Sequence, residues 1–301
     1  MKFSVFQTSH KGGRPLNEDR LGYSYTREAV LLVLADGMGG HPDGEVAAQI
    51  AVQVYTDRFR ALARPALPEV ESFLVDTLLL ANDAIMTHAE KHHLDDNPRT
   101  TLVAAVVQEG HVTTIHTGDS RFYWVRNGMV LQRTRDHSYQ EKSSLIKHGT
   151  EHVSRNILFT CLGSPTTPLY DVMPAGVLQQ GDRLLLCSDG LWGVLEDDDV
   201  ATRLTEGPLS ETLPSMTRLA LERGGRHGDN VSSLALDWET PEDFEPTRVI
   251  HTESLADDGF ASTFQLTPLD DTLEDFDDEA IERSIAEIND AIRRTAQRKT
   301  P

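Results

Sequence analysis

Apolar runs and helix-type spacing alternate along the first 240 residues of the chain. Residues 30–35 form a continuous apolar run that ends at Asp36 and is bounded by turn residues, which is typical of a strand buried on both faces. Gly37 and Gly39 follow and allow the backbone to turn sharply there. We therefore expect Asp36 to lie at the end of a buried strand.

The other patterns predict further strands and helices. Apolar residues at helical spacing predict helices over residues 43–62, 69–93, 196–205 and 210–223. Short β-type runs predict strands over residues 4–8, 102–108, 112–117, 122–126, 129–132, 183–187 and 231–238. Asn127-Gly128 is a strong signal for a two-residue hairpin turn. A short polar helix is expected from Asp136 to about Gly149, and residues 151–163 are expected to be irregular, either as a mobile flap or as a plain surface loop.

Four predicted strand edges carry an aspartate next to a glycine. The pairs are Asp36-Gly37, Gly118-Asp119, Asp189-Gly190 and Gly228-Asp229. Turn formation and helix capping can explain one such pair, but they do not explain why two apolar strands end in the same Asp-Gly. Carboxylates beside bare carbonyl groups suit a hard cation, and an all-oxygen donor set selects Mg²⁺ or Mn²⁺ over zinc.

The composition is that of an acidic globular protein. The 301 residues are 39% hydrophobic and carry a formal net charge of −20, which provides a sizeable core but argues against nucleic-acid binding, because that binding needs Lys and Arg to neutralise phosphates. An unrelated two-metal nuclease is disfavoured for the same reason. We find neither a signal-peptide pattern nor an apolar run near the roughly 20 residues of a membrane span, and therefore expect a cytoplasmic protein with no membrane partner. Cys161 and Cys187 are interpreted as core thiols.

The C-terminal segment, residues 241–301, differs from the rest of the chain. It holds 16 acidic and 6 basic residues, a net charge of −10, so it carries half of the total. Residues 241–268 are expected to lack regular structure. Over about residues 276–298, Ile281, Ile285, Ile288 and Ile292 predict an amphipathic helix, which either docks on the domain formed by residues 1–240 or binds a partner.

Seven short motifs follow one another in the first 240 residues. They are Arg14-Pro15-Leu16-Asn17-Glu18-Asp19, Asp36-Gly37-Met38-Gly39-Gly40-His41, Thr100-Thr101, Gly118-Asp119-Ser120-Arg121, Asp136-His137-Ser138, Ser188-Asp189-Gly190-Leu191 and Gly228-Asp229-Asn230. In their order and spacing the chain resembles the metal-dependent protein serine/threonine phosphatases of the PP2C type, in their bacterial form. The resemblance implies an α+β fold, a four-layer αββα sandwich of two antiparallel sheets flanked by helices, with residues 1–240 as the catalytic domain.

The resemblance also implies a binuclear Mn²⁺ or Mg²⁺ centre at one end of the sandwich. By position, Asp36 bridges the two ions and the Gly37 carbonyl binds one of them. Asp189 and Asp229 bind the other, and Glu18 acts through bound water. Asp19 and Asn230 have supporting roles, and in bacterial members the counterparts of Asp119 and Asp189 hold a third, weaker ion. Arg14 is the expected phosphate clamp, because its planar fork matches two phosphate oxygens.

Some residues depart from the family pattern, and others match it but leave their role open. Met38 stands where many eukaryotic members have a histidine proposed as general acid, and a thioether cannot donate a proton. The leaving-group proton is then expected from water, and a structural hydrogen bond is the simpler role for His41. Arg99 replaces the glycine usual before Thr100-Thr101, which affects the local geometry of that turn. Arg121 and His137 also match family positions and are interpreted as a buried ion pair and a loop contact.

The sequence thus predicts a phosphoprotein phosphatase that hydrolyses phosphoserine or phosphothreonine through direct attack of a metal-activated water. Its expected partners are phosphoprotein substrates, with an opposing Ser/Thr kinase as a further hypothesis. The alternative is a non-catalytic regulatory module that uses the same fold and the acidic tail to bind a partner. Such a module would be expected to lose one or more of Asp36, Asp189 and Asp229, and all three are present.

Overall fold

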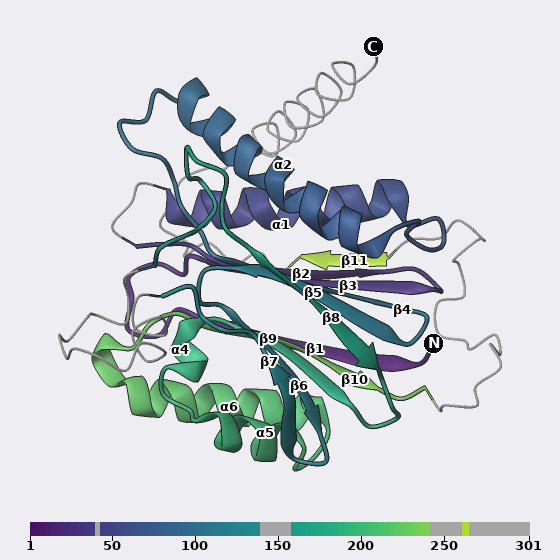
Figure 1. Cartoon of the computed structure of the whole chain (residues 1–301). Coiled ribbons are helices and arrows are strands. Elements are labelled where there is room, and N and C mark those ends of the chain that lie inside the picture. The colour runs from purple at the N-terminus through teal and green to yellow at the C-terminus, as the bar shows by residue number, and fades with distance from the viewer. Residues whose placement is uncertain (40–42, 139–157, 241–260, 265–301) are drawn as a thin grey trace, which may run out of the picture. The chain divides into compact units, whose positions relative to one another are not determined.

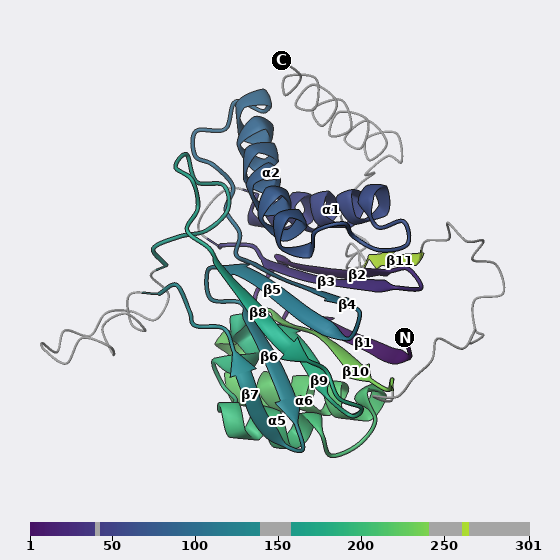
Figure 2. The same cartoon turned by 45° about the vertical axis from the view of Figure 1, so that its right-hand side comes forward.

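The computed structural model describes residues 1–39, 43–138, 158–240 and 261–264 (Figure 1). Two antiparallel sheets are stacked in the middle of this part of the chain, and helices cover the outer face of each, as Figures 1 and 2 show. The four-layer αββα arrangement expected from the sequence is confirmed.

The six-stranded sheet has the order β11-β2-β3-β4-β5-β8. Its strands are β2 (Asp19–Tyr25), β3 (Ala29–Asp36), β4 (Leu102–Gln108), β5 (His111–Thr117), β8 (Asp171–Val177) and β11 (Ala261–Phe264). All residues of β3 from Ala29 to Ala35 are buried, as expected for a central strand that helices cover on one face and the second sheet on the other.

The five-stranded sheet has the order β1-β10-β9-β6-β7. Its strands are β1 (Phe3–His10), β6 (Arg121–Arg126), β7 (Met129–Arg133), β9 (Arg183–Cys187) and β10 (Val231–Trp238). The predicted hairpin between β6 and β7 is confirmed, and both Asn127 and Gly128 have positive φ angles, at 50° and 75°. These angles are those that a two-residue type I′ turn requires.

Three apolar clusters hold the layers together. Helices α1 (Gly44–Leu62) and α2 (Val70–Lys91) pack on the six-stranded sheet around Tyr55, Phe59 and Leu78. Helices α5 (Asp197–Leu204) and α6 (Leu209–Gly224) pack on the five-stranded sheet, together with the short helix α4 (Asp189–Trp192). The cluster between the sheets includes both aromatic and aliphatic side chains from their inner faces. Within the described residues, no helix combines the length and the apolar character that crossing a membrane requires.

The structure corrects one predicted element. Residues 134–137 have no helical structure, and Ser138 forms a β-bridge with Leu158, so no helix begins at Asp136. The Asp136 side chain instead makes a two-pronged ion pair with Arg121, with both N–O distances at 2.8 Å. The buried ion pair expected for Arg121 is therefore confirmed, and the rest of the predicted helix lies outside the described residues.

Three strands were not predicted. The period-two pattern of Leu21, Tyr23 and Tyr25 in β2 follows directly on a charged motif that is typical of a loop. Strand β8 contains Pro174 and Gly176, which are tolerated because it lies at a sheet edge. Strand β11 lies inside residues 241–268, where no regular structure was expected, and pairs with β2.

Candidate metal centre

The ends of strands from both sheets bring the predicted acidic residues together. Asp19 begins β2 and lies directly opposite Asp36 at the end of β3. In the other sheet, Asp189 follows β9, and Asp229 precedes β10. Strands β9 and β10 are neighbours in that sheet. The two sheets are joined here, because the Ser188 hydroxyl donates a hydrogen bond of 2.8 Å to the Asp19 carboxylate.

The backbone around Asp36 is held by the Thr100-Thr101 motif. The Thr101 N–H and the Thr100 hydroxyl donate to the Asp36 carbonyl at 2.8 and 2.9 Å, and the Thr101 hydroxyl accepts from the Asp36 N–H at 3.1 Å. Gly37 follows in a tight space, where a Cβ atom would lie 2.5 Å from the Gly44 carbonyl oxygen. Any larger residue at position 37 would displace the start of α1 or this turn.

The carboxylates raise one another's pKa values. Burial, followed by the charges of Asp19, Asp189 and Asp119, raises the pKa of Asp36 well above its ordinary value. Burial and the charges of Asp119 and Asp229 do the same for the pKa of Asp189. For Asp119, burial and then Asp136 raise the pKa to about 7. Buried carboxylates that repel one another stay ionised together only when a cation compensates their charge.

Two orphaned oxygen atoms also fit a cation. Oε2 of Glu18 and Oδ1 of Asp19 are buried and have no hydrogen-bond partner, although buried polar atoms normally have one. Burial raises the pKa of Asp19, and hydrogen bonds with Ser232 and Ser188 lower it in part, so that the pKa lies at about 6. The donor set therefore fits a divalent cation that prefers oxygen ligands, such as Mn²⁺ or Mg²⁺.

Asn230 connects the loops around the acidic residues. Its side-chain carbonyl accepts from the Glu18 N–H at 2.8 Å, and its amide group donates to the carbonyls of Lys11 and Leu16 at 2.8 and 2.9 Å. These bonds explain why an asparagine follows Asp229, because both a donor and an acceptor are needed. The supporting role expected for Asn230 is in keeping with this geometry.

Arg14 lies at the rim of the acidic cluster. Its Nη2 atom is 2.6 Å from Oδ2 of Asp229, and about half of its side chain is exposed. A hydrogen bond and the charge of Asp229, and then the charges of Asp189 and Glu18, raise its pKa. An exposed guanidinium beside these carboxylates is placed to meet an anion that enters the site.

The residues that depart from the family pattern have structural contacts. The Met38 N–H donates to the Arg99 carbonyl at 2.9 Å, and the Arg99 side chain lies 3.5 Å from the Asp96 carboxylate. The turn before Thr100 therefore forms with arginine in place of glycine. His41 lies outside the described residues.

A second polar cluster was not predicted from the sequence. His116, His137 and Asp171 each place a donor atom within 4.8 Å of the others, and no three carboxylates of the acidic cluster come so close within the described residues. His116 and His137 stack with ring centroids 4.5 Å apart. The Gly118 N–H donates to Nδ1 of His137, so Nε2 carries the proton and donates to Asp171 at 3.2 Å. This arrangement opposes metal binding by His137 and supports the loop contact expected for it.

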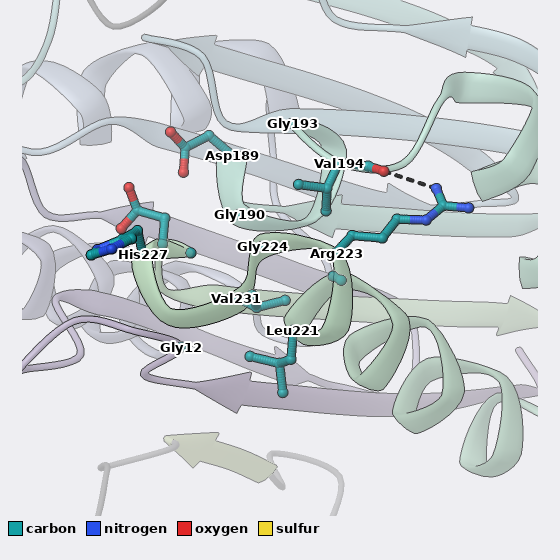
Figure 3. Close-up of a pocket in the computed structure, with 14 residues that line it drawn as sticks. Gly12, Asp189, Gly190, Gly193, Val194, Leu221, Arg223, Gly224, His227 and Val231 are labelled. Atoms are coloured by element: carbon teal, nitrogen blue, oxygen red, sulfur yellow. Dashed lines mark hydrogen bonds between the residues drawn. The ribbon is translucent and has the colours of Figure 1, made fainter.

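A cavity of about 360 Å³ adjoins the acidic cluster and shares Asp189 and Asp229 with it (Figure 3). Its other walls come from α4, from the end of α6 and from the segment that leads into β10. The acidic site is therefore open on this side to a group larger than a phosphate.

We expect the metal-free protein to lose stability as the pH rises from about 4 to about 7, the interval between the ordinary and the folded-state pKa of Asp119. The folded form holds a proton at Asp119 that the unfolded chain releases, so deprotonation favours unfolding over this interval. Asp119→Asn should reduce the difference in unfolding free energy between pH 5 and pH 8 by on the order of 2 kcal/mol. Urea unfolding in chelator measures this, with Asp76→Asn, an exposed site on α2, as the control. Equal differences in both variants would mean that the Asp119 carboxyl is ionised in the metal-free fold.

Comparisons with known proteins agree with this architecture. The family model described as "Protein phosphatase 2C" matches residues 6–224. The chain is similar to the serine/threonine phosphatase stp of Listeria innocua, with 32% identity over 77% of this chain and 94% of that protein. It is also similar to the crystal structure of the serine/threonine phosphatase Stp1 from Staphylococcus aureus, with 29% identity, a TM-score of 0.72 and coverage of 79% and 96%.

A further similar structure is the catalytic domain of the serine/threonine protein phosphatase PstP in complex with two manganese ions. The identity is 29% and the TM-score 0.66, over 78% of this chain and 97% of that one. The family model covers well over half of the chain, and the Listeria relative is matched over nearly its whole length. On these grounds the chain belongs to the protein phosphatase 2C family.

Proposed function

We propose that the protein is a metal-dependent phosphatase that removes phosphate from phosphoserine and phosphothreonine in other proteins. The observation that carries this proposal is the convergence of Asp36, Asp189 and Asp229 from two different sheets beside an exposed arginine. Folding does not need such a cluster of mutually repelling carboxylates, whereas binding divalent cations does.

Asp36 and the Gly37 carbonyl would hold one ion, with Asp36 shared between the two, and Asp189 and Asp229 would hold the other. Glu18 would contribute through water, and Asp19 and Asn230 would keep the ligands in position. When bound, the two ions lower the pKa of a water molecule and offset charge on the phosphoryl oxygens. No covalent enzyme intermediate is then needed. Asp119 and Asp189 would hold a third, weaker ion.

Arg14 would bind the phosphate of the substrate. In this structure Arg14 pairs with Asp229. When cations bind to the Asp229 carboxylate, they replace Arg14 as its partner. The guanidinium would then offer two parallel N–H donors to phosphoryl oxygens. Met38 cannot protonate the leaving group, so we assign that proton to water.

Catalysis is favoured over a non-catalytic regulatory module for two reasons. All the expected metal ligands are retained, and the relatives are named as phosphatases. We further propose a cytoplasmic protein that opposes a Ser/Thr kinase, in which residues 1–240 form the catalytic domain and β11 adds an edge strand to its six-stranded sheet. The predicted helix at about 276–298 lies outside the described residues, and its docking on the catalytic domain or binding to a partner stays a hypothesis.

The test is hydrolysis of a phosphothreonine peptide and of p-nitrophenyl phosphate by the full chain. We expect turnover with Mn²⁺ or Mg²⁺ and none in excess chelator, and a side-by-side titration identifies the preferred metal. Arg14→Ala should lower kcat/KM by about tenfold to fiftyfold, as expected when a charge-assisted hydrogen bond to phosphate is lost. The kcat/KM of Arg14→Lys should lie between those of the wild type and Arg14→Ala. A folded, metal-loaded protein that hydrolyses neither substrate would overturn the proposal and favour the regulatory module.

A further inference from the structure

Two loops pack side by side at the edge of the acidic cluster. The first contains residues 10–14, and the second contains the short helix η1 (Gly225–His227) and residues 228–230. The Gly13 N–H donates to the Gly228 carbonyl at 2.9 Å, and a Cβ atom on Gly13 would lie 2.3 Å from the Arg226 carbonyl oxygen. The Asn230 side chain also donates to the Lys11 carbonyl at 2.8 Å. The backbones of the two loops are thus in contact, and these contacts fix the position of both loops relative to Asp229.

Besides His10 and Arg14, these loops expose the basic side chains of Lys11, Arg226 and His227, and we call these three residues the basic rim. Among the described residues, neither Lys11 nor Arg226 forms an ion pair. In a chain with a net charge of −20, exposed cations would be expected to find carboxylate neighbours. The basic rim instead stands next to Arg14, which pairs with Asp229.

One residue of the basic rim, His227, lines the cavity beside the acidic cluster. Gly12, Gly228 and Asp229 also line it, and Val194, Ala220 and Leu221 contribute apolar walls. Figure 3 shows the Arg223 side chain directed away from Asp189, toward Val194, whose carbonyl accepts from its Nη1 atom at 2.9 Å. Arg223 also pairs with Asp199 at 3.2 Å. Its charge is compensated there, whereas Lys11 and Arg226, the chain neighbours of the lining residues Gly12 and His227, form no ion pair within the described part of the chain.

We propose that the basic rim binds an acidic group of the substrate protein close to the phosphorylated residue. This inference rests on the proposed phosphatase function and names its substrate class. When the phosphoryl group lies at the acidic cluster, a neighbouring side chain of the substrate lies near the cavity and the two loops. A group with negative charge gains Coulomb energy at the rim, whereas it is repelled by most of this acidic surface. The group is either a carboxylate side chain or a second phosphate.

The experiment compares three phosphothreonine peptides with the full chain loaded with Mn²⁺. One peptide has neutral neighbours, one has glutamates beside the phosphothreonine, and one has a second phosphoserine there. Each exposed ion pair changes binding by a factor of about 1.4 to 5, so we expect the better acidic peptide to exceed the neutral one about fivefold in kcat/KM. The preference should fall between about 0.05 M and about 0.5 M salt, because salt screens exposed charges.

The double variant Lys11→Gln/Arg226→Gln should abolish this preference and leave hydrolysis of p-nitrophenyl phosphate unchanged. Arg64→Gln/Arg218→Gln is the matched control, since it removes the same charge from two exposed sites outside the two loops. If the glutamate peptide alone discriminates, the ligand is a carboxylate, and if the doubly phosphorylated peptide alone does, it is a phosphate. Equal rates on all three peptides, or the same loss of preference in the control, would overturn the inference. Failure of the phosphatase proposal would look different, because no phosphorylated substrate would then be hydrolysed.

Discussion

Replacing Asp36 with asparagine is expected to abolish phosphatase activity, with a loss of at least about 10³-fold in kcat for both a phosphopeptide and an aryl phosphate. Asp36 is expected to bridge both ions, so the change weakens both sites at once. Asparagine fits the same space and keeps the backbone hydrogen bonds with Thr100 and Thr101. The loss therefore reports on the carboxylate charge and not on the fold.

The same variant gives a readout that does not depend on activity. Burial, and then the charges of the neighbouring carboxylates, raises the pKa of Asp36 in the metal-free fold, so removing its charge should stabilise the metal-free protein at pH 8. Saturating Mn²⁺ should stabilise the wild type by about 3–4 kcal/mol at 100 to 1,000 times the dissociation constant, and the variant much less. Asp76→Asn, which changes an exposed carboxylate on α2, should behave like the wild type. Full Mn²⁺ stabilisation of Asp36→Asn would show that the ions bind elsewhere.

Two of the strands that carry the site, β3 and β9, were predictable because their sequences are unambiguous, whereas β2, which begins with Asp19, was not predicted. An apolar run that leads into Asp-Gly has few structural alternatives, and both strands formed as expected. Their proximity in the fold was not predictable from local sequence, because Asp36 ends a strand of one sheet and Asp189 follows a strand of the other. No local sequence pattern indicates that the ends of two sheets lie together. The order of the motifs predicted this only through the resemblance to a known family.

The failures occurred where long-range contacts decide the structure. Asp136 followed by His137 and Ser138 has the composition of a helix start, but Asp136 is bound by Arg121. That buried ion pair outweighs a cap. Likewise, β11 forms by pairing with the edge of β2, which lies more than 200 residues away in the chain. The stacked pair of His116 and His137 could not be predicted either, because β5 and the segment after β7 meet only in the fold.

A single methyl group at Gly190 is expected to disrupt the metal centre without altering any of its ligands. A Cβ atom there would lie 2.0 Å from the carbonyl oxygen of Asn230 and 2.9 Å from its carbon. Asn230 cannot move aside easily, because its side chain bonds to Glu18, Lys11 and Leu16. Gly190→Ala must therefore push Asp189 and Asp229 apart, since these residues precede Gly190 and Asn230 directly.

We expect Gly190→Ala to lower kcat/KM by on the order of 10²-fold, as a misplacement of about 1 Å in a catalytic centre does. It should also lower the free energy of unfolding by about 2–3 kcal/mol, the usual cost of overpacking. Gly224→Ala is the matched control, because nothing lies within 4 Å of its Cβ position and its φ of −69° suits alanine. That variant should keep full activity and stability. If Gly190→Ala keeps its Mn²⁺ affinity and loses only stability, the close approach of α4 to Asn230 serves the fold alone. If it loses Mn²⁺ affinity while the metal-free protein still unfolds cooperatively, the contact sets the spacing of the metal ligands.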